Sequence, residues 1–585
     1  MTKLTVLLTT EGTYPFHQGG VSTWCDILVK KLNTVDFTLY SVITDPFITQ
    51  KFQLPKSTQL VKVPLWGTEE PCEHLPDPFA LVYLKKKRTT TKVVQRLFIP
   101  IFQKLIYEII SPKKNPEAFG HILLQMYQYF QEYEYKETFK SELVWNEYKS
   151  FMLEAVNNPE LKFADPDIYG FVQSLGWVYR FLNIVNTPVP KTDVSHSSAA
   201  AFCGIPCVIA KLEHGTPFLL TEHGVYLREQ YLSLSKRNLP AFLNTFLIRF
   251  IHSITALNFY YADQVSPVCH YNTRWESRLG VPKENIEVIY NGVDTDLFVE
   301  ADKVERMNPT VVSVARIDPI KDIVSLIKTA AIVKKMVPNV RFIVYGSVSV
   351  PSYYEECLEL RKKLGLEETF TFAGHTTNVV AAYHSGDIVA LSSISEAFPY
   401  SVVEAMITGK PVVATDVGGI KEALGNTGYL VTPRNPEEFA KYITLLLVDT
   451  NLRQTLGREA RERALDYFTL EKVLDHHERS YRNLAHRANK QQPIFEKDIS
   501  ISKEKMQKLY SEKAYALFAN GYYKEAIGQF RLAIHIDPRS PAAFVYSSEI
   551  VKLYHYLGQY NKAVEEMDKL QHFIQTEQHL YENVT

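Results

Sequence analysis

Between residues 310 and 465, six short apolar runs alternate with helix-like stretches. The runs are TVVSVAR, VRFIVYG, FTFAGH, DIVALSS, PVVATDVGG and GYLVTP. Short apolar runs that are each followed by a helical stretch are typical of parallel strands covered by helices on both faces. The alternation therefore predicts a doubly wound, Rossmann-like α/β domain over residues 301–465.

The first 300 residues carry a second series of the same kind. A strand, a glycine-containing loop, a helix and a strand lead to residue 43, and the alternation resumes after residue 165. The later strand-like pieces are DVSH (193–196), PFLLTEH (217–223), QVSPV (264–268) and IEVIYNG (286–292). This predicts a Rossmann-like N-terminal domain over 1–300.

Residues from about 50 to 165 interrupt that series. They are rich in Tyr, Phe and Lys and are mostly helical in periodicity, so we interpret them as a helical insertion. The basic run from Lys85 to Arg88 within it fits a solvated loop. A contact with an anionic partner or a membrane surface is the alternative.

The C-terminal part reads as a crossover helix and linker (466–499) and an all-helical tail (500–585). Gly521 aligns with Gly558, and Ala526 with Ala563, both at a shift of 37 residues. This self-similarity predicts a tetratricopeptide-like tail, although the period is longer than the usual ~34 residues. Two units leave a face uncovered, so the tail either packs on the rest of the chain or docks a partner of a membrane complex. The aromatic residues expected to line that face are Tyr546, Tyr554, Tyr556 and Tyr560.

Charge and composition exclude several classes of protein. The formal net charge of the 585 residues is -1, which gives no reason to expect nucleic-acid binding. Dispersed cysteines and an N-terminal apolar stretch too short for a signal peptide predict a cytoplasmic protein. The longest apolar segment, 241–262, contains polar residues and predicts a buried helix, with a membrane-surface segment as the alternative.

The segment SSISEAFPYSVVEAM (392–406) carries the clearest chemical signal. Glu396 and Glu404 follow a predicted strand, and ligands of such sheets bind at the carboxyl ends of strands. Backbone N–H groups at the start of the next helix point toward an anion or sugar hydroxyls. A ribose diol suits the Glu404 carboxylate. Ser401 to Glu404 also forms a capping-box pattern, so a structural role stays open for Glu404.

Two further loops supply groups for a diphosphate. Arg316 and Lys321 follow the first strand of the second domain, and a guanidinium and an ammonium there suit two phosphates. Solvated surface cations are the alternative. In the first domain, Gly19 and Gly20 allow close approach of backbone to a phosphate or sugar. The loop lacks the GxGxxG pattern, which argues against NAD.

Two histidines end consecutive strands of the first domain. His196 follows DVS and His223 follows PFLLTE, and we expect both to face the cleft. Structural hydrogen bonding is the alternative for each. The sequence contains no HExxH, no clustered His and Cys, and no DxD between strands, so no metal site is predicted.

These pieces together resemble the large family 4 of retaining glycosyltransferases with the GT-B fold. The stretches that carry the resemblance are VARIDPIK (314–321), VIYNGVD (288–294), the Glu396–Glu404 pair and KPVVATDVGG (410–419). Other stretches look like the PelF group, whose enzymes contribute to an exopolysaccharide: TEGTYPFHQGGVSTW (10–24), PFLLTEHGVYLREQ (217–230), YNTRWESRLG (271–280) and SSISEAFP (392–399).

The resemblance implies a role for each candidate residue on the donor side. Arg316 and Lys321 would neutralise the diphosphate of the donor. Glu396 would contact the hydroxyls of the donor sugar, and Glu404 would hold the ribose. The donor it implies is a nucleotide sugar, by family habit a UDP-sugar, with no separate cofactor and no metal.

The remaining candidates complete the implied site. Gly19 and Gly20 would supply amides to the phosphate, and His223 would border the donor sugar. The base would lie near the segment from Gly374 to Asn378. The turn that precedes the helix of Glu404 would line the donor pocket through Ala397, Phe398, Pro399 and Tyr400.

Three functions compete on this reading. A metal-independent hexosyltransferase moves a sugar to a saccharide acceptor, and a glycosidase uses Glu396 and Glu404 as its carboxyl pair. A diphosphate site has no purpose in a glycosidase. The third function is that of a non-catalytic scaffold or binding protein on a transferase fold. The cytoplasmic enzyme would be recruited to the inner face of the membrane through its tail.

Overall fold

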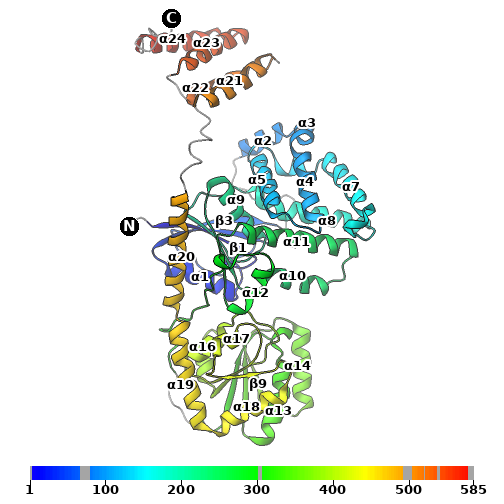
Figure 1. The fold of residues 1–585 in the computed structure, drawn as a ribbon, viewed down its shortest axis with the longest axis vertical. Coiled ribbons are helices and arrows are strands. Elements are labelled where there is room, and N and C mark those ends of the chain that lie inside the picture. The colour runs from blue at the N-terminus through cyan, green and yellow to red at the C-terminus, as the bar shows by residue number, and fades with distance from the viewer. Residues whose placement is uncertain are drawn as a thin grey trace. The chain divides into compact units, whose positions relative to one another are not determined.

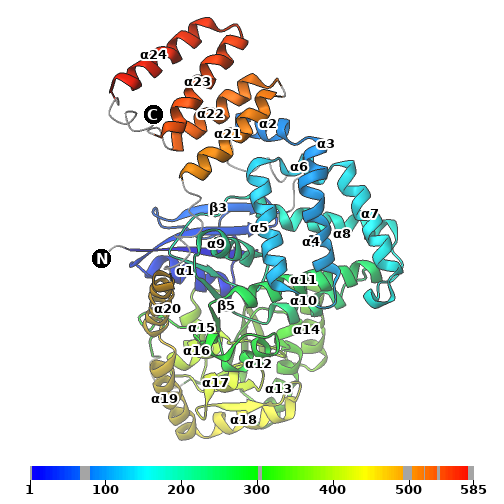
Figure 2. The same cartoon turned by 45° about the horizontal axis from the view of Figure 1, so that its top comes forward.

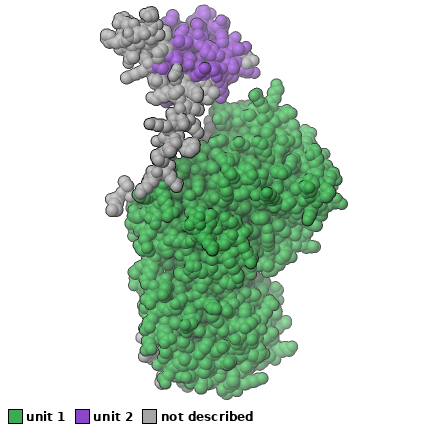
Figure 3. Space-filling model, in the orientation of Figure 1, with its two compact units in different colours: residues 1–488 green, residues 489–585 purple. Residues whose placement is uncertain are grey.

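The computed structural model describes residues 3–65, 79–300, 306–491, 503–519, 521–536 and 540–576. The chain divides into two compact units, residues 1–488 and 489–585 (Figure 3). The larger unit contains two parallel sheets, each with helices on both of its faces (Figure 1). The doubly wound architecture predicted from the alternating apolar runs is therefore confirmed.

The first sheet has six parallel strands in the order β3-β2-β1-β4-β5-β6. They are β1 (Leu4–Glu11), β2 (Val35–Ile43), β3 (Gln59–Pro64), β4 (Val194–Ser197), β5 (Phe218–Glu222) and β6 (Gln264–Pro267). The helices of this domain outside the insertion are α1 (Gly20–Lys31), α9 (Ile205–His214), α10 (Tyr226–Ser235), α11 (Ala241–Tyr261) and α12 (His270–Arg278).

Two secondary-structure assignments made from sequence are wrong. The strand β3 lies inside the stretch interpreted as a helical insertion, because this edge strand is short, partly exposed and not a continuous apolar run. The segment 286–292 is not a strand. Ile286 makes only an isolated bridge to Val265 at the edge of the sheet, and the chain then leaves for the second domain.

The insertion is a helical layer built on aromatic packing. Its helices are α2 (Phe79–Arg88), α3 (Thr91–Val93), α4 (Ile99–Ile110), α5 (Pro116–Glu132), α6 (Tyr135–Phe139), α7 (Glu142–Asn157) and α8 (Ile168–Phe181), with a π-helical turn at Val94–Phe98. The rings of Phe98, Phe130 and Phe139 pack together within its core: those of Phe130 and Phe139 stack, and that of Phe98 lies tilted or edge-on to them. The basic run from Lys85 to Arg88 is the last turn of α2 rather than a loop. Cations are favoured at a helix C-terminus, and Lys86 also pairs with Glu137 at 2.5 Å.

The apolar helix α11 is buried inside the first domain, as predicted for residues 241–262. Its polar groups have partners. The Arg249 guanidinium donates to the carbonyls of Ile110 and Leu161, and the Asn258 amide donates to the carbonyl of Ala201 at 2.9 Å. Within the described ranges, no helix is both long and apolar enough to cross a membrane.

The second sheet also has six parallel strands, in the order β12-β11-β10-β7-β8-β9. They are β7 (Thr310–Val314), β8 (Arg341–Tyr345), β9 (Phe370–Gly374), β10 (Ile388–Leu391), β11 (Val412–Thr415) and β12 (Tyr429–Val431), one for each predicted run. Its helices are α13 (Ile323–Met336), α14 (Pro351–Lys363), α15 (Val379–His384), α16 (Tyr400–Ile407), α17 (Ile420–Leu424) and α18 (Pro436–Val448).

The chain crosses between the two α/β domains twice. Helix α19 (Thr450–Tyr467) packs on α16, and α20 (Leu470–Gln491) returns along the first domain (Figures 1 and 2). At the crossing, Val293 N–H donates to the carbonyl of Phe468, and Leu470 N–H donates to that of Val293, both at 2.9 Å. Tyr481 and Leu484 of α20 are buried in the core of the first domain. Residues 492–499 of the predicted crossover helix and linker (466–499) lie outside the described residues.

The smaller unit consists of helices in two hairpins. They are α21 (Lys503–Ala519), α22 (Tyr523–Ile536), α23 (Pro541–Tyr556) and α24 (Tyr560–Thr576). Gly521 and Gly558, at the two hairpin turns, have φ of 79° and 67°, where glycine is favoured. The expected aromatic face is half wrong, because Tyr546 and Tyr554 are buried in the core of this unit. Tyr556 and Tyr560 are exposed.

Candidate active site

The predicted donor-side residues lie at one edge of the second sheet. Arg316 and Lys321 follow β7, Gly374 ends β9, and Glu396 follows β10. Because all these strands are parallel, their carboxyl ends share one edge. Gly374 has φ of 77°, and Asn378 caps α15 by accepting a hydrogen bond from Ala381 N–H at 3.0 Å.

Lys321 and Glu396 form an ion pair that closes the loops after β7 and β10. Their side chains are only 17% and 12% exposed, and Ser393 Oγ donates to the same Glu396 oxygen at 2.6 Å. The backbone joins the two loops as well, since Ile394 N–H donates to the carbonyl of Ile320 at 2.8 Å. A cation and a carboxylate are thus held side by side at the edge where a ligand would bind.

Arg316 lies at the same edge but is more loosely held. Its side chain is exposed and donates to Ser349 Oγ at 3.3 Å. A long, exposed guanidinium with one weak partner can turn toward an anion at little cost. The structure thus places the two cations of the predicted diphosphate site in different surroundings, one paired and one free to reorient.

Glu404 lies in the second turn of α16, and the capping-box interpretation is wrong. The helix begins at Tyr400 with Pro399 as its N-cap, and no side chain in the described part of the chain caps it, because Ser401 is already inside the helix. Glu404 Oε2 instead accepts a hydrogen bond from the Tyr383 hydroxyl at 2.6 Å. Burial raises the pKa of Glu404 to about 7.

The turn before α16 is fixed from both domains. The carbonyl of Ala397 accepts from Gly419 N–H at 2.7 Å and from Cys269 Sγ at 3.4 Å. Phe398 is buried, and its carbonyl accepts from the Asn291 amide at 3.1 Å. The first N–H groups of α16 have no acceptor inside the helix, and this turn holds them in place.

Gly20 lies opposite Tyr400 across the two domains. It is the first residue of α1, and Gly19 is the N-cap. A Cβ built on Gly20 would lie 3.8 Å from the Tyr400 ring, and one on Gly19 would meet no described atom within 4 Å. The neighbouring residues therefore do not require glycine at these two positions, and the space beside the α1 N-terminus is open to a ligand.

The two strand-end histidines differ in their surroundings. His196 is buried and uses both ring nitrogens, Nδ1 with the Tyr481 hydroxyl at 2.7 Å and Nε2 with Thr221 Oγ1 at 2.8 Å. The expectation that His196 faces the cleft is wrong, because α20 covers it. His223 packs at 4.6 Å from the Trp24 ring, and its Nε2 has no hydrogen-bond partner among the described residues. Burial lowers the pKa of His223 to about 3, so the ring is neutral.

Sequence reasoning missed two contributors to this site. Tyr383 contacts Glu404 from a different helix, and no motif marks it. Gly418 has φ of +60°, and a Cβ there would lie 1.7 Å from the carbonyl oxygen of Glu396. The double glycine in DVGG indicates a close approach of the backbone to another segment. The sequence does not indicate that this segment is the loop of Glu396.

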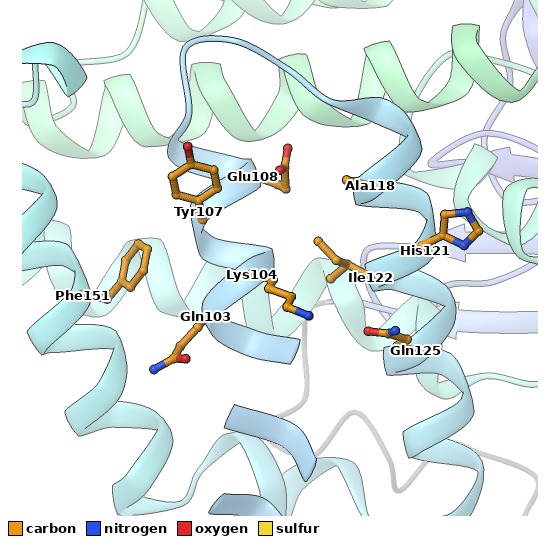
Figure 4. A pocket seen from close by; sticks show the side chains of 9 residues that line it. All are labelled: Gln103, Lys104, Tyr107, Glu108, Ala118, His121, Ile122, Gln125 and Phe151. Atoms are coloured by element: carbon orange, nitrogen blue, oxygen red, sulfur yellow. The ribbon is translucent and has the colours of Figure 1, made fainter. Parts of the chain in front are cut away.

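A pocket of about 470 Å³ lies apart from these residues, on the insertion. It is bounded by α4, α5 and Phe151 of α7, and Lys104 and Gln125 extend toward one another across it (Figure 4). None of the predicted site residues lines it. In the described part of the chain, no group of three or more His, Cys, Asp or Glu side chains is placed to hold a metal ion.

Two family models match different parts of this chain. Residues 4–284 match a domain of unknown function, DUF3492, and residues 296–463 match the family described as glycosyl transferases group 1. The chain is 27% identical over 234 residues to N-acetyl-alpha-D-glucosaminyl L-malate synthase of Bacillus anthracis. That match covers 38% of this chain and 59% of the relative, less than two thirds of its length.

Solved structures share the fold of the larger unit. Sucrose-phosphate synthase from Thermosynechococcus elongatus has a TM-score of 0.53 at 17% identity, covering 82% of this chain and 99% of that one. Anabaena Alr3699/HepE, crystallised in complex with UDP, has a TM-score of 0.50 at 17% identity, covering 82% and 100%. The two parallel sheets therefore form a GT-B fold.

Proposed function

We propose that this GT-B chain is a nucleotide-sugar-dependent hexosyltransferase. The match of residues 296–463 to the glycosyl transferases group 1 family supports the proposal. The observation that carries the proposal is the Lys321–Glu396 pair at the carboxyl edge of the second sheet, with Glu404 on the following helix. The pair offers a cation for a phosphate and a carboxylate for sugar hydroxyls within one contact. Neither a glycosidase nor a scaffold needs cations for a diphosphate.

In this proposal the donor separates the ion pair. Lys321 turns to the diphosphate, Arg316 swings onto the second phosphate, and Glu396 accepts from hydroxyls of the donor sugar. Gly19 and Gly20 leave room for a phosphate at the α1 N-terminus, where backbone N–H groups and the helix dipole favour an anion. The leaving group is then stabilised by fixed charges and dipoles.

The reaction proceeds with retention at the anomeric carbon. The bond from that carbon to the donor phosphate oxygen breaks, and the acceptor hydroxyl oxygen bonds to the carbon on the same face. The acceptor proton passes to the departing phosphate oxygen, so no carboxylate is needed on the opposite face. His223, neutral through burial, donates or accepts a hydrogen bond beside the donor sugar without carrying charge.

Finer assignments extend this proposal. The donor is a UDP-sugar, in keeping with the UDP held by the Anabaena structure of the same fold. The resemblance of the segments 10–24 and 217–230 to the PelF group of family 4 supports a role in exopolysaccharide synthesis. The helical tail is tetratricopeptide-like and docks a protein of a membrane complex, which brings the enzyme from the cytoplasm to the inner face of the membrane.

UDP binding tests the proposal directly. We expect UDP to raise the melting temperature of the protein, and the shift to persist in EDTA, because Arg316 and Lys321 carry the charge that a metal would otherwise supply. A ligand at a hundredfold excess over Kd stabilises the fold by about 2.7 kcal/mol. GDP and ADP serve as controls for base preference. A shift that disappears on chelation contradicts metal independence, and the absence of any nucleotide effect leaves the scaffold function.

A further inference from the structure

Tyr383 is a fully buried donor directed at the candidate ribose carboxylate. It lies in α15, its side chain has no exposed surface, and its hydroxyl donates to Glu404 Oε2 at 2.6 Å. Burial, with the charge of Glu404 as a second cause, holds the pKa of the Tyr383 phenol well above its usual range. The hydroxyl therefore keeps its proton and acts as a donor throughout the neutral pH range.

The ring of Tyr383 is held on several sides. It belongs to the same buried cluster as Val402 and Met406 of α16, and its centroid lies 6.3 Å from that of Phe298. A buried ring in such a cluster has little rotational freedom, so the position of its hydroxyl is well defined. Through this hydroxyl, α15 holds the side chain of a residue on α16.

The hydrogen bond also gives the two oxygens of the Glu404 carboxylate different roles. Tyr383 occupies Oε2 and so leaves Oε1 to accept from a ligand. A carboxylate on a helix can rotate about its side-chain torsions, and fixing one oxygen sets the direction of the other. α15 begins at Val379, directly after Asn378, the last residue of the segment expected to contact the base. Base and ribose contacts would then be coupled by one short helix.

We propose that Tyr383 is a positioning residue that holds Glu404 in the orientation in which it accepts hydrogen bonds from the ribose of the donor nucleotide. The inference rests on the proposed function, because it requires that a nucleotide bind at this edge. It assigns a role to a residue of α15 that touches no substrate itself.

The protonation of Glu404 provides an independent readout. Burial raises its pKa to about 7, and the Tyr383 hydrogen bond opposes that rise. Ribose hydroxyls donate best to the ionised carboxylate, so ribose-dependent affinity increases as the pH rises through about 7. Removing the Tyr383 hydroxyl moves that midpoint to higher pH. In the described part of the chain, Tyr383 and Tyr400 are the titratable groups whose phenol pKa values the charge of Glu404 raises.

The test compares Tyr383→Phe with the wild-type protein. Calorimetry measures Kd for UDP and for 2′-deoxy-UDP between pH 6 and 8.5, and the ratio of the two cancels titration of the phosphates. We expect the wild-type preference for the ribonucleotide to fall by about tenfold in Tyr383→Phe, the effect of one hydrogen bond to a charged group. The pH midpoint of the preference should move upward.

Two controls separate positioning from stability. Tyr353→Phe removes another buried hydroxyl of the same domain, one that accepts from Val324 N–H at 3.2 Å, and it should leave the ribose preference unchanged. In a Glu404→Gln background, adding Tyr383→Phe should have no further effect on the preference. An additive effect there, or an unchanged preference in Tyr383→Phe alone, overturns the inference while UDP binding stands. Failure of the wild-type protein to bind UDP overturns the proposed function as well.

Discussion

At the scale of single residues, the site depends on charges held together before any ligand arrives. Lys321 and Glu396 are largely buried and paired, and Ser393 supports the carboxylate. Most of the cost of desolvating the two groups has thus been met in the folded state. A donor that offers a phosphate and hydroxyls replaces the pair with partners of the same charge and hydrogen-bonding character.

Replacing Lys321 tests that arrangement. We expect Lys321→Ala to lower kcat/KM for donor turnover at least ~10²-fold, about 2.7 kcal/mol of barrier, because the departing diphosphate loses its closest cation. Steady-state kinetics against donor concentration measure the effect. Lys334→Ala is the control, since Lys334 lies in α13 of the same domain and, within the described ranges, donates only to the carbonyl of Gly365. Equal activity of the two variants would contradict the role of Lys321.

At the scale of elements, the turn before α17 determines where Glu396 lies. Gly418 and Gly419 pack against the backbone of residues 396 and 397 so closely that neither position has room for a side chain. The N-terminus of α12 is fixed nearby, because Glu422 of α17 accepts from His270 N–H at 2.7 Å. The helices α12 and α17 therefore lie against the donor-side loop at residues 396 and 397. The close contact between this loop and the turn before α17 explains why glycine is needed at positions 418 and 419.

Gly418→Ala tests this close approach. The new Cβ would lie 1.7 Å from the Glu396 carbonyl, so we expect the loop to shift, kcat/KM to fall and the melting temperature to drop. Gly365→Ala is a matched control. Its φ of +61° imposes the same backbone strain, of order 1 kcal/mol, but no described atom lies within 4 Å of its Cβ. If both variants lose only stability and keep donor turnover, the turn does not position Glu396.

At the scale of the whole molecule, α20 is the last helix that contributes to the core of the larger unit. Tyr481 and Leu484 of that helix are buried in the first domain, and the Tyr481 hydroxyl binds His196. The smaller unit has its own core around Phe530 and Ile550. Each unit thus has the apolar contacts that a separately folding body requires.

Deleting residues from 492 onward tests the role of the tail. We expect the shortened protein to fold and to hydrolyse the donor slowly, because every candidate site residue and α20 remain. Membrane recruitment and polymer output should fall in cells, since the tail is proposed to dock the partner. Fractionation of cell extracts and measurement of polymer check the two effects. An insoluble product, or one still found with membranes, would contradict docking by the tail.

The local sequence pattern alone determines the strands of the second sheet and the hairpin turns of the tail. The six apolar runs between 310 and 465 each became a strand, because continuous apolar segments are buried wherever a parallel sheet forms. Arg316, Lys321 and Glu396 follow such runs, and the carboxyl ends of parallel strands meet at one edge of the sheet, so their shared location is predictable from sequence. The turns at Gly521 and Gly558 were marked by residue type.

Only the tertiary structure decided which of these residues act together. His196 and His223 look alike in sequence. The packing of α20, nearly three hundred residues further along the chain, covers His196, whereas Nε2 of His223 has no hydrogen-bond partner among the described residues. The sequence around Glu404 also fits a helix cap. In the structure, Tyr383 from another helix donates a hydrogen bond to the Glu404 carboxylate. The edge strand β3 was hidden because its burial depends on one neighbour. Each of these contacts joins segments that no local pattern connects, so their partners are set by the packing of the whole core.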